Sequence, residues 1–142
     1  MLKYIIIFLC IGLASGHYDE VTGTVTKVID GDTIDVMVTA GDHRLLAGDI
    51  ARIRLADIDT PEVRGPKACE AGRNASAYTC AWLLSNTVLL DIDNKTGQDS
   101  FDRWVAVVYL QDGRNFNMQL VTSGHATLDD FKNNEFDPAD WR

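Results

Sequence analysis

Charged side chains that suit phosphate chemistry occur in three short clusters of this sequence. The first cluster contains Asp32, the second contains Arg54, Asp59 and Glu62, and the third contains Arg103. Two carboxylates, a backbone carbonyl and water form the all-oxygen shell that Ca²⁺ prefers, and two arginines can grip a phosphodiester through paired hydrogen bonds. A further carboxylate beside the cation can accept a proton from water. Together the clusters predict a site that hydrolyses phosphodiesters.

Each cluster has an ordinary structural explanation when it is taken alone. An Asp-Gly-Asp segment such as residues 30–32 is typical of a turn. A lone arginine such as Arg103 is usually solvated or part of a surface ion pair. The hypothesis therefore depends on the whole set, and on a fold that brings its members together.

The elements that must position these residues are mostly short strands. Alternating and β-branched side chains predict strands over residues 21–29, 33–39, 50–57, 87–93 and 104–111. Helical spacing predicts helices over residues 71–85 and 117–123, the second ended by Gly124. Three strands, a helix, two strands and a helix favour an α+β fold, a five-stranded Greek-key barrel of the OB type with two helices. The chain after Gly124 is expected to be irregular.

Composition and charge limit the kind of protein this is. The chain has 142 residues, 46% of them apolar and 24% charged, which is typical of one globular domain. It carries 13 Lys and Arg against 21 Asp and Glu, a formal net charge of −8. That balance excludes a broad basic surface that follows nucleic-acid phosphates. Positive charge for a phosphate substrate must be local, or supplied by a metal.

The N-terminal residues are typical of a secretory signal peptide. Lys3 precedes an apolar run over residues 4–13, and small residues follow up to Gly16. A membrane span needs about 20 apolar residues, so this run is too short. We expect residues 1–16 to be removed and residues 17–142 to form one domain, secreted or periplasmic and without membrane attachment.

Cleavage would leave two cysteines, Cys69 and Cys80. An oxidising compartment permits a disulfide between them. If both lie on one helix, however, they are about 16 Å apart, which is beyond bridging distance. A bond is possible only if Cys69 lies in the preceding loop and folds back, so the sequence leaves this question open.

The clusters also resemble a known family, that of staphylococcal (micrococcal) nuclease or thermonuclease. The resemblance extends over about residues 21–126. The matching segments are VIDGDT at 28–33, IRLADIDTPE at 53–62, ASAY at 75–78, Arg103 and the predicted helix that precedes Gly124. The pair V-I-D-G-D-T and R-L-x-x-x-D-T-P-E is its most specific part.

The resemblance implies an OB-fold nuclease that requires Ca²⁺ and leaves 3′-phosphorylated fragments of DNA or RNA. The implied metal ligands are Asp32, Asp59 and the main-chain carbonyl of Thr60. The implied catalytic residues are Arg54, Glu62 and Arg103. We expect a monomer that prefers single strands, because a narrow pocket cannot hold a duplex phosphate in line for attack without deforming the duplex.

The sequence departs from the family pattern in several places. The hairpin between the second and third strands is longer, and Phe101 replaces a tyrosine that contacts a nucleotide phosphate. Residues 129–131, Asp-Asp-Phe, replace an aromatic and basic stretch, so that Phe131 is a partial substitute. Only eleven residues follow Phe131, so the family's third helix is expected to be truncated or diverged.

Two other kinds of function compete with a nuclease. The first is a non-catalytic OB-fold module that binds nucleic acid or a protein partner, but such a module has no need of Glu62. The second is a structural domain with a Ca²⁺ site, which leaves Arg54 and Arg103 without a role.

Overall fold

A computed structural model describes residues 21–141, so the predicted signal peptide lies outside the described residues. The strands are β1 (Val21–Asp30), β2 (Thr33–Ala40), β3 (Ile50–Leu55), β4 (Ile58–Asp59), β5 (Thr87–Ile92), β6 (Trp104–Tyr109) and β7 (Thr127–Leu128). The helices are α1 (Glu70–Leu83), α2 (Phe116–Thr122) and the 3₁₀ helix η1 (Pro138–Asp140). Among the described residues, no helix combines the length and apolarity needed to cross a membrane.

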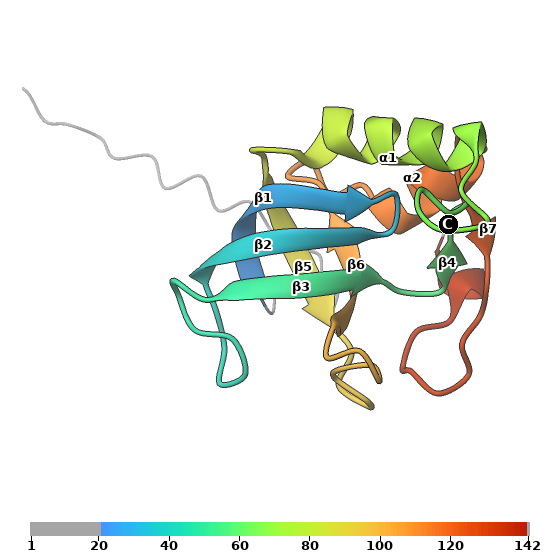
Figure 1. The fold of residues 1–142 in the computed structure, drawn as a ribbon. Helices are drawn as coiled ribbons and strands as arrows, with labels where there is room; N and C mark the ends of the chain where they lie inside the picture. The colour runs from blue at the N-terminus through green and yellow to red at the C-terminus, as the bar shows by residue number, and fades with distance from the viewer. Residues whose placement is uncertain (1–20, 142) are drawn as a thin grey trace, which may run out of the picture.

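Five strands close into a barrel in the order β1-β2-β3-β6-β5 (Figure 1). Strand β3 pairs parallel to β6, and the other barrel pairs are antiparallel. Strands β4 and β7 form a separate two-stranded sheet. The predicted five-stranded OB-type barrel with helices is therefore confirmed.

The barrel interior holds the apolar residues that alternate along the strands. Val25, Ile34, Ile53 and Leu90 are fully buried there, and each such side chain contributes about 1.5–3 kcal/mol by burial. Helix α2 adds Phe116 to the same core. Because successive strand residues point to opposite faces, the charged residues between them are directed away from the core.

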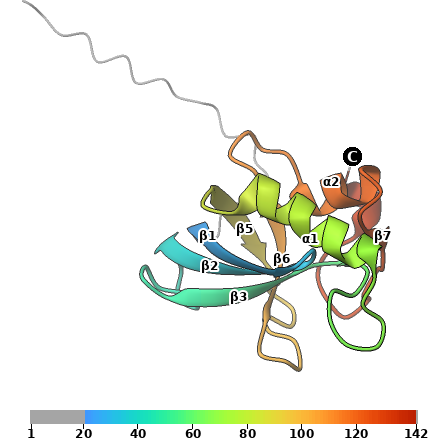
Figure 2. The same ribbon diagram turned by 45° about the horizontal axis from the view of Figure 1, so that its top comes forward.

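Two buried polar contacts attach the helices to the barrel. Helix α1 lies beside β1 (Figures 1 and 2), and its buried Thr79 Oγ1 donates to the carbonyl oxygen of Gly31 at 2.8 Å. On α2, Asn117 Oδ1 accepts from Val108 N at 3.0 Å while its Nδ2 donates to Ala56 O at 3.0 Å. These contacts fix the helices against the strands that carry the candidate residues.

Some predicted bounds and elements were wrong. Strand β3 ends at Leu55 rather than at 57, because Asp57 has a φ of 56° and turns the chain toward β4. Helix α1 ends at Leu83, because Leu84 leaves helical geometry and Ser85 has a φ of 65°. Strand β7 and η1 lie where irregular chain was expected. After Phe131, η1 is the only helix among the described residues, at the place where the sequence predicted a truncated or diverged third helix.

The two cysteines of the described residues are free thiols. Cys69 immediately precedes α1 and Cys80 lies within it. The structure therefore has no disulfide between them.

Candidate active site

Three strands bring the predicted residues to one end of the barrel. The β1–β2 turn, the end of β3 and β4 lie together there, at the right in Figure 1. Strand register sets Thr33 opposite Arg54 and Ile53 opposite Trp104, the residue after Arg103. The two arginines therefore approach each other although they are far apart in sequence.

Asp32 is the more buried of the two predicted carboxylate ligands, with 6% of its surface exposed. Its Oδ2 accepts a hydrogen bond from Thr60 N at 3.1 Å, and its Oδ1 accepts one from Thr33 Oγ1 at 3.1 Å. Burial opposes ionisation, but the Arg54 charge and these hydrogen bonds outweigh it, so the pKa of Asp32 is lowered. Asp32 is thus held as a carboxylate in a fixed orientation.

Arg54 is held by four oxygen atoms. Its Nη1 donates to the carbonyl oxygens of Leu55 at 2.6 Å and Ile58 at 2.9 Å. Its Nη2 lies 3.4 Å from Asp32 Oδ2 and 3.6 Å from Asp59 Oδ1. One guanidinium therefore joins both predicted carboxylate ligands and fixes the turn that leads into β4.

Arg103 is oriented by its own loop. Its Nε donates to Asp99 Oδ2 at 2.8 Å, and Nη1 lies 3.5 Å from Thr33 Oγ1. The guanidinium also stacks over the Phe101 ring, with 5.2 Å from Cζ to the ring centroid. Within residues 21–141, Nη2 makes no hydrogen bond, so one donor edge of Arg103 is left for a ligand.

Glu62 lies on the loop that follows Asp59 and Thr60. Its side chain is exposed, and after burial and the charge of Asp32, its charge also contributes to the raised pKa of Asp59. Its carbonyl oxygen accepts from Cys69 N at 3.1 Å. A Cβ at position 72 would lie 2.1 Å from that oxygen, so only glycine lets α1 approach the loop so closely.

Negative charge exceeds positive charge at this site. Burial, the hydrogen bond to Asp32 and the charge of Asp32 raise the pKa of Asp30 to about 6. Burial and then the charge of Asp32 raise the pKa of Asp59, against the single opposing charge of Arg54. Such an excess of carboxylate oxygens is stabilised by a bound cation.

The donor set therefore fits a hard divalent cation. Asp32 and Asp59 approach the same Arg54 nitrogen, and Thr60 is buried beside them. Their oxygens are the ligand type that Ca²⁺ prefers. The described residues contain no group of three or more His, Cys, Asp or Glu side chains suited to a metal, and the predicted set has two carboxylates and a carbonyl.

A cleft of about 470 Å³ opens beside the two arginines. Arg54 and Arg103 line it, together with Phe101, Phe131 and Asn134. Phe101 is 76% exposed and Phe131 is 44% exposed. The cleft thus offers guanidinium groups and apolar rings, which suits a nucleotide with its phosphate and base.

The C-terminal segment, residues 129–136, is attached to the cleft by Asp57. This fully buried residue accepts hydrogen bonds through Oδ1 from Asn134 Nδ2 at 2.7 Å and from Phe131 N at 3.0 Å. Its carbonyl oxygen accepts from Asp129 N at 2.9 Å. The segment occupies the place where the family's third helix was expected to begin.

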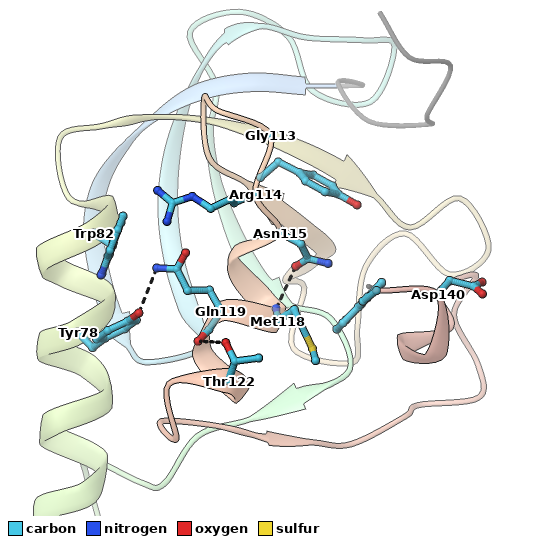
Figure 3. A pocket seen from close by; sticks show the side chains of 11 residues that line it. Tyr78, Trp82, Gly113, Arg114, Asn115, Met118, Gln119, Thr122 and Asp140 are labelled. Carbon is cyan, nitrogen blue, oxygen red and sulfur yellow. Dashed lines mark hydrogen bonds between the residues drawn. The ribbon is translucent and has the colours of Figure 1, made fainter.

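A larger cavity, of about 760 Å³, lies between α1 and α2 and contains none of the predicted site residues (Figure 3). In Figure 3, Gln119 Nε2 donates to the hydroxyl of Tyr78 at 3.1 Å across this cavity. Arg114 lies over the Trp82 ring at 5.0 Å and pairs with Asp112 at 2.8 Å. This cavity is separate from the catalytic candidates.

The structure brings Asp32, Asp59 and Thr60 together around Arg54, joins Arg103 to them through Thr33, and keeps Glu62 on the adjoining loop. Sequence reasoning missed three supporting residues, which are Thr33, Asp57 and Asp99. Asp99 and Arg103 pair within the loop between β5 and β6, where a four-residue spacing is not the helical signal for an ion pair. Thr33 and Asp57 lie within the two quoted motifs, but their contacts with Arg103 and with residues 131–134 are distant in sequence and were not predictable from those motifs.

Comparison with known proteins identifies relatives. The family model described as "Staphylococcal nuclease homologue" matches residues 52–140. The chain is 34% identical over 107 residues to an "Uncharacterized endonuclease" of Escherichia coli O157:H7, covering 75% of this chain and 60% of that protein. It is 30% identical over 107 residues to "SPbeta prophage-derived endonuclease YokF" of Bacillus subtilis (strain 168), covering 74% of this chain and 33% of that protein. It is 30% identical over 134 residues to "Protein ParB" of Escherichia coli, covering 89% and 67%.

The matched region extends over most of this chain but over less than two thirds of the first two relatives. The family match includes Arg54, Asp59, Glu62 and Arg103, and it continues through the C-terminal segment. The closed five-stranded barrel agrees with that match. The chain therefore belongs to the staphylococcal nuclease homologue family.

Proposed function

We propose that this protein is an exported, Ca²⁺-dependent nuclease that hydrolyses phosphodiester bonds of DNA or RNA. One observation carries the proposal. Arg54 and Arg103 are oriented by separate acidic partners at the edge of one cleft, beside a cluster with excess carboxylate charge. The family and the endonuclease names of two relatives support it.

The chain's own residues supply the chemistry as follows. Glu62 accepts a proton from the water whose oxygen attacks phosphorus in line with the departing 5′ oxygen. Arg54 and Arg103 donate to the nonbridging oxygens, where charge develops in the five-coordinate transition state. The bond from phosphorus to the 5′ oxygen breaks, the departing 5′ oxygen takes a proton from solvent water, and the phosphate stays on the 3′ side.

Ca²⁺ would be held by Asp32, Asp59 and the Thr60 carbonyl, where it would neutralise phosphate charge and polarise the phosphorus centre. Asp32 is held as a carboxylate by Thr33 and by Thr60 N–H, so this ligand needs no reorganisation. Phe101 and Phe131 provide apolar surface for the sugar and base at the cleft.

The direct test is cleavage of labelled single-stranded DNA and RNA by residues 17–142, with Ca²⁺ or with a chelator. We expect Ca²⁺-dependent fragments that end in a 3′-phosphate, and slower cleavage of intact duplex. Arg103→Gln should reduce cleavage strongly, since it removes a charge at the cleft. Arg114→Gln is the matched control, because its guanidinium pairs with Asp112 at the separate cavity.

The outcome also separates the competing functions. Single-strand binding without cleavage, at saturating Ca²⁺, would refute the nuclease and favour a non-catalytic OB-fold module. Equal losses in the Arg103 and Arg114 variants would show that net charge matters and that the cleft does not.

A further inference from the structure

A second groove, of about 420 Å³, adjoins the candidate active site. Val28, Ile29 and Val63 give it apolar surface, and Arg64, Arg73 and Ser76 give it polar groups. Ile29 immediately precedes Asp30, and Val63 immediately follows Glu62. One wall of the groove therefore comes from the chain segments that also carry Asp30 and Glu62, and α1 forms its other wall.

The groove differs in charge from the rest of the protein. No acidic side chain lines it, although the chain has a net charge of −8. The other described arginines each pair with an aspartate: Arg44, Arg52, Arg54, Arg103 and Arg114. Within residues 21–141, the side chains of Arg64 and Arg73 have no ion pair and no hydrogen bond.

Two arginines that face one groove without internal partners are suited to an external anion. Each guanidinium can bind a phosphate through two parallel hydrogen bonds, and the hydroxyl of Ser76 adds a donor. The apolar surface of Val28 and Val63 suits a sugar or a base. Phosphate, sugar and base alternate along a nucleic-acid strand, so the chemistry of the groove matches the substrate of the adjoining site.

On the basis of the nuclease function proposed above, we propose that this groove binds a phosphodiester that flanks the scissile one. Arg64 and Arg73 hold the flanking phosphate, and the strand continues from the catalytic cleft past Glu62 to α1. The groove thereby supplies the local positive charge that an acidic nuclease needs for strands longer than a dinucleotide.

The proposal predicts a specific salt dependence. Each phosphate neutralised on a single strand contributes roughly −0.7 to the slope of log K against log salt. Arg64→Gln with Arg73→Gln should therefore make the slope shallower by roughly 0.7 for one phosphate, or about 1.4 for two. If one contact is lost, the ratio of the affinity at 50 mM salt to the affinity at 200 mM salt should fall by about threefold.

Binding is measured by fluorescence anisotropy with a labelled single-stranded dodecanucleotide and saturating Ca²⁺. All proteins carry Glu62→Gln, so that the strand stays intact. The double arginine variant is compared with Arg114→Gln, whose slope should equal that of the parent. Arg64 and Arg73 are exposed, so both variants should fold, and melting temperatures verify this.

A second measurement locates the phosphate. Neutral methylphosphonate linkages are placed one at a time along the dodecanucleotide. The parent should lose affinity at a linkage near the scissile position, and the double variant should lose none at that same linkage. A penalty that disappears at one linkage only indicates direct contact between that phosphate and the two arginines. A change in net charge alone would affect all linkages alike.

Equal slopes and equal linkage penalties in the parent and the double variant would overturn the proposal. If poly-glutamate then competed only with groove-intact protein, the groove would be assigned to an acidic polypeptide instead. Cleavage by wild-type protein is assayed separately. If the wild-type protein cleaves the strand but the double variant keeps the same linkage penalties, only the proposed role of the groove is refuted. If the linkage penalty disappears in the double variant but the wild-type protein does not cleave, only the nuclease function is refuted.

Discussion

Asp57 provides the sharpest test of how the C-terminal segment is held at the cleft. Asp57→Ala removes the acceptor for Asn134 Nδ2 and Phe131 N. Each buried donor left without a partner costs about 1–3 kcal/mol, and alanine at a φ of 56° adds about 1–2 kcal/mol. Because the Phe131 amide is only partly buried, we expect a loss of roughly 3–6 kcal/mol, a large share of a typical stability of about 5–15 kcal/mol.

Asp57→Asn is the matched comparison. Asparagine keeps the Oδ1 acceptor and tolerates positive φ, and it replaces Oδ2, which has no hydrogen-bond partner among the described residues. We expect it to stay within about 1 kcal/mol of wild type. Asp57→Gly relieves the backbone strain but loses both hydrogen bonds, so its loss should be about 1–2 kcal/mol smaller than that of alanine.

Urea unfolding followed by tryptophan fluorescence measures these differences. The exposed Asp112→Ala change, which removes a surface ion pair and the hydrogen bond from Arg114 N, serves as control and should shift the unfolding midpoint much less than Asp57→Ala does. In cleavage assays, Asp57→Ala should raise KM more than it lowers kcat, because Phe131 is displaced while Arg54 and Arg103 stay in place. If the alanine and asparagine variants unfold at the same urea concentration, the hydrogen bonds of Asp57 do not hold the segment.

The remaining predictions concern catalysis, metal and pH. Glu62→Gln should lower turnover by about 10²–10⁴-fold with little change in strand affinity; single-turnover cleavage at saturating Ca²⁺ measures this, and wild-type turnover would contradict it. Asp32→Ala and Asp59→Ala should each weaken Ca²⁺ binding in calorimetric titration, and Ca²⁺ should raise the melting temperature of wild type more than that of either variant; equal affinities would exclude this site. Burial opposes ionisation of Asp93, but hydrogen bonds from Thr96 and from backbone amides lower its pKa. The ionised Asp93 therefore stabilises the folded protein at pH values above the ordinary carboxyl pKa, and this stabilisation is lost as pH falls through the lowered pKa. The difference in melting temperature between wild type and Asp93→Asn should therefore shrink on acidification, and a constant difference would contradict the pKa shift.

The strands and helices followed from local sequence because barrel strands have one buried face. In β2 and β3, apolar side chains such as Ile34 and Ile53 alternate with polar ones, and the alternation predicts both the element and its buried face. The end of β3 was predicted two residues too late. Alternation stops at Leu55, because Ala56 is a second apolar residue in succession, and the turn at Asp57 depends on a backbone conformation stabilised by contacts with residues 129–134.

In the candidate site too, some residues were predictable from local sequence and others were not. Arg54, Asp59 and Glu62 belong to one short motif, and the motif was sufficient to identify them. The role of Thr33 depends on a pairing between β2 and β3 and on the parallel pairing of β3 with β6. Those pairings place the Thr33 hydroxyl between Asp32 and Arg103. Local sequence does not predict them, because they depend on how the strands are arranged in the closed barrel.

The charge distribution explains how an acidic chain can act on a polyanion. Aspartates orient Arg54 and Arg103, and the same aspartates cancel most of the field that these arginines project into solvent. In the proposed function, the same ion pairs that orient these two arginines toward the substrate therefore weaken their long-range attraction for it. Attraction must then come from charge that has no internal partner, which is a cation at Asp32 and Asp59 and the guanidinium groups of Arg64 and Arg73. Because Glu62 lies between Asp59 and Arg64 in the chain, the proposed function has a strand drawn to either one pass the proposed catalytic residues.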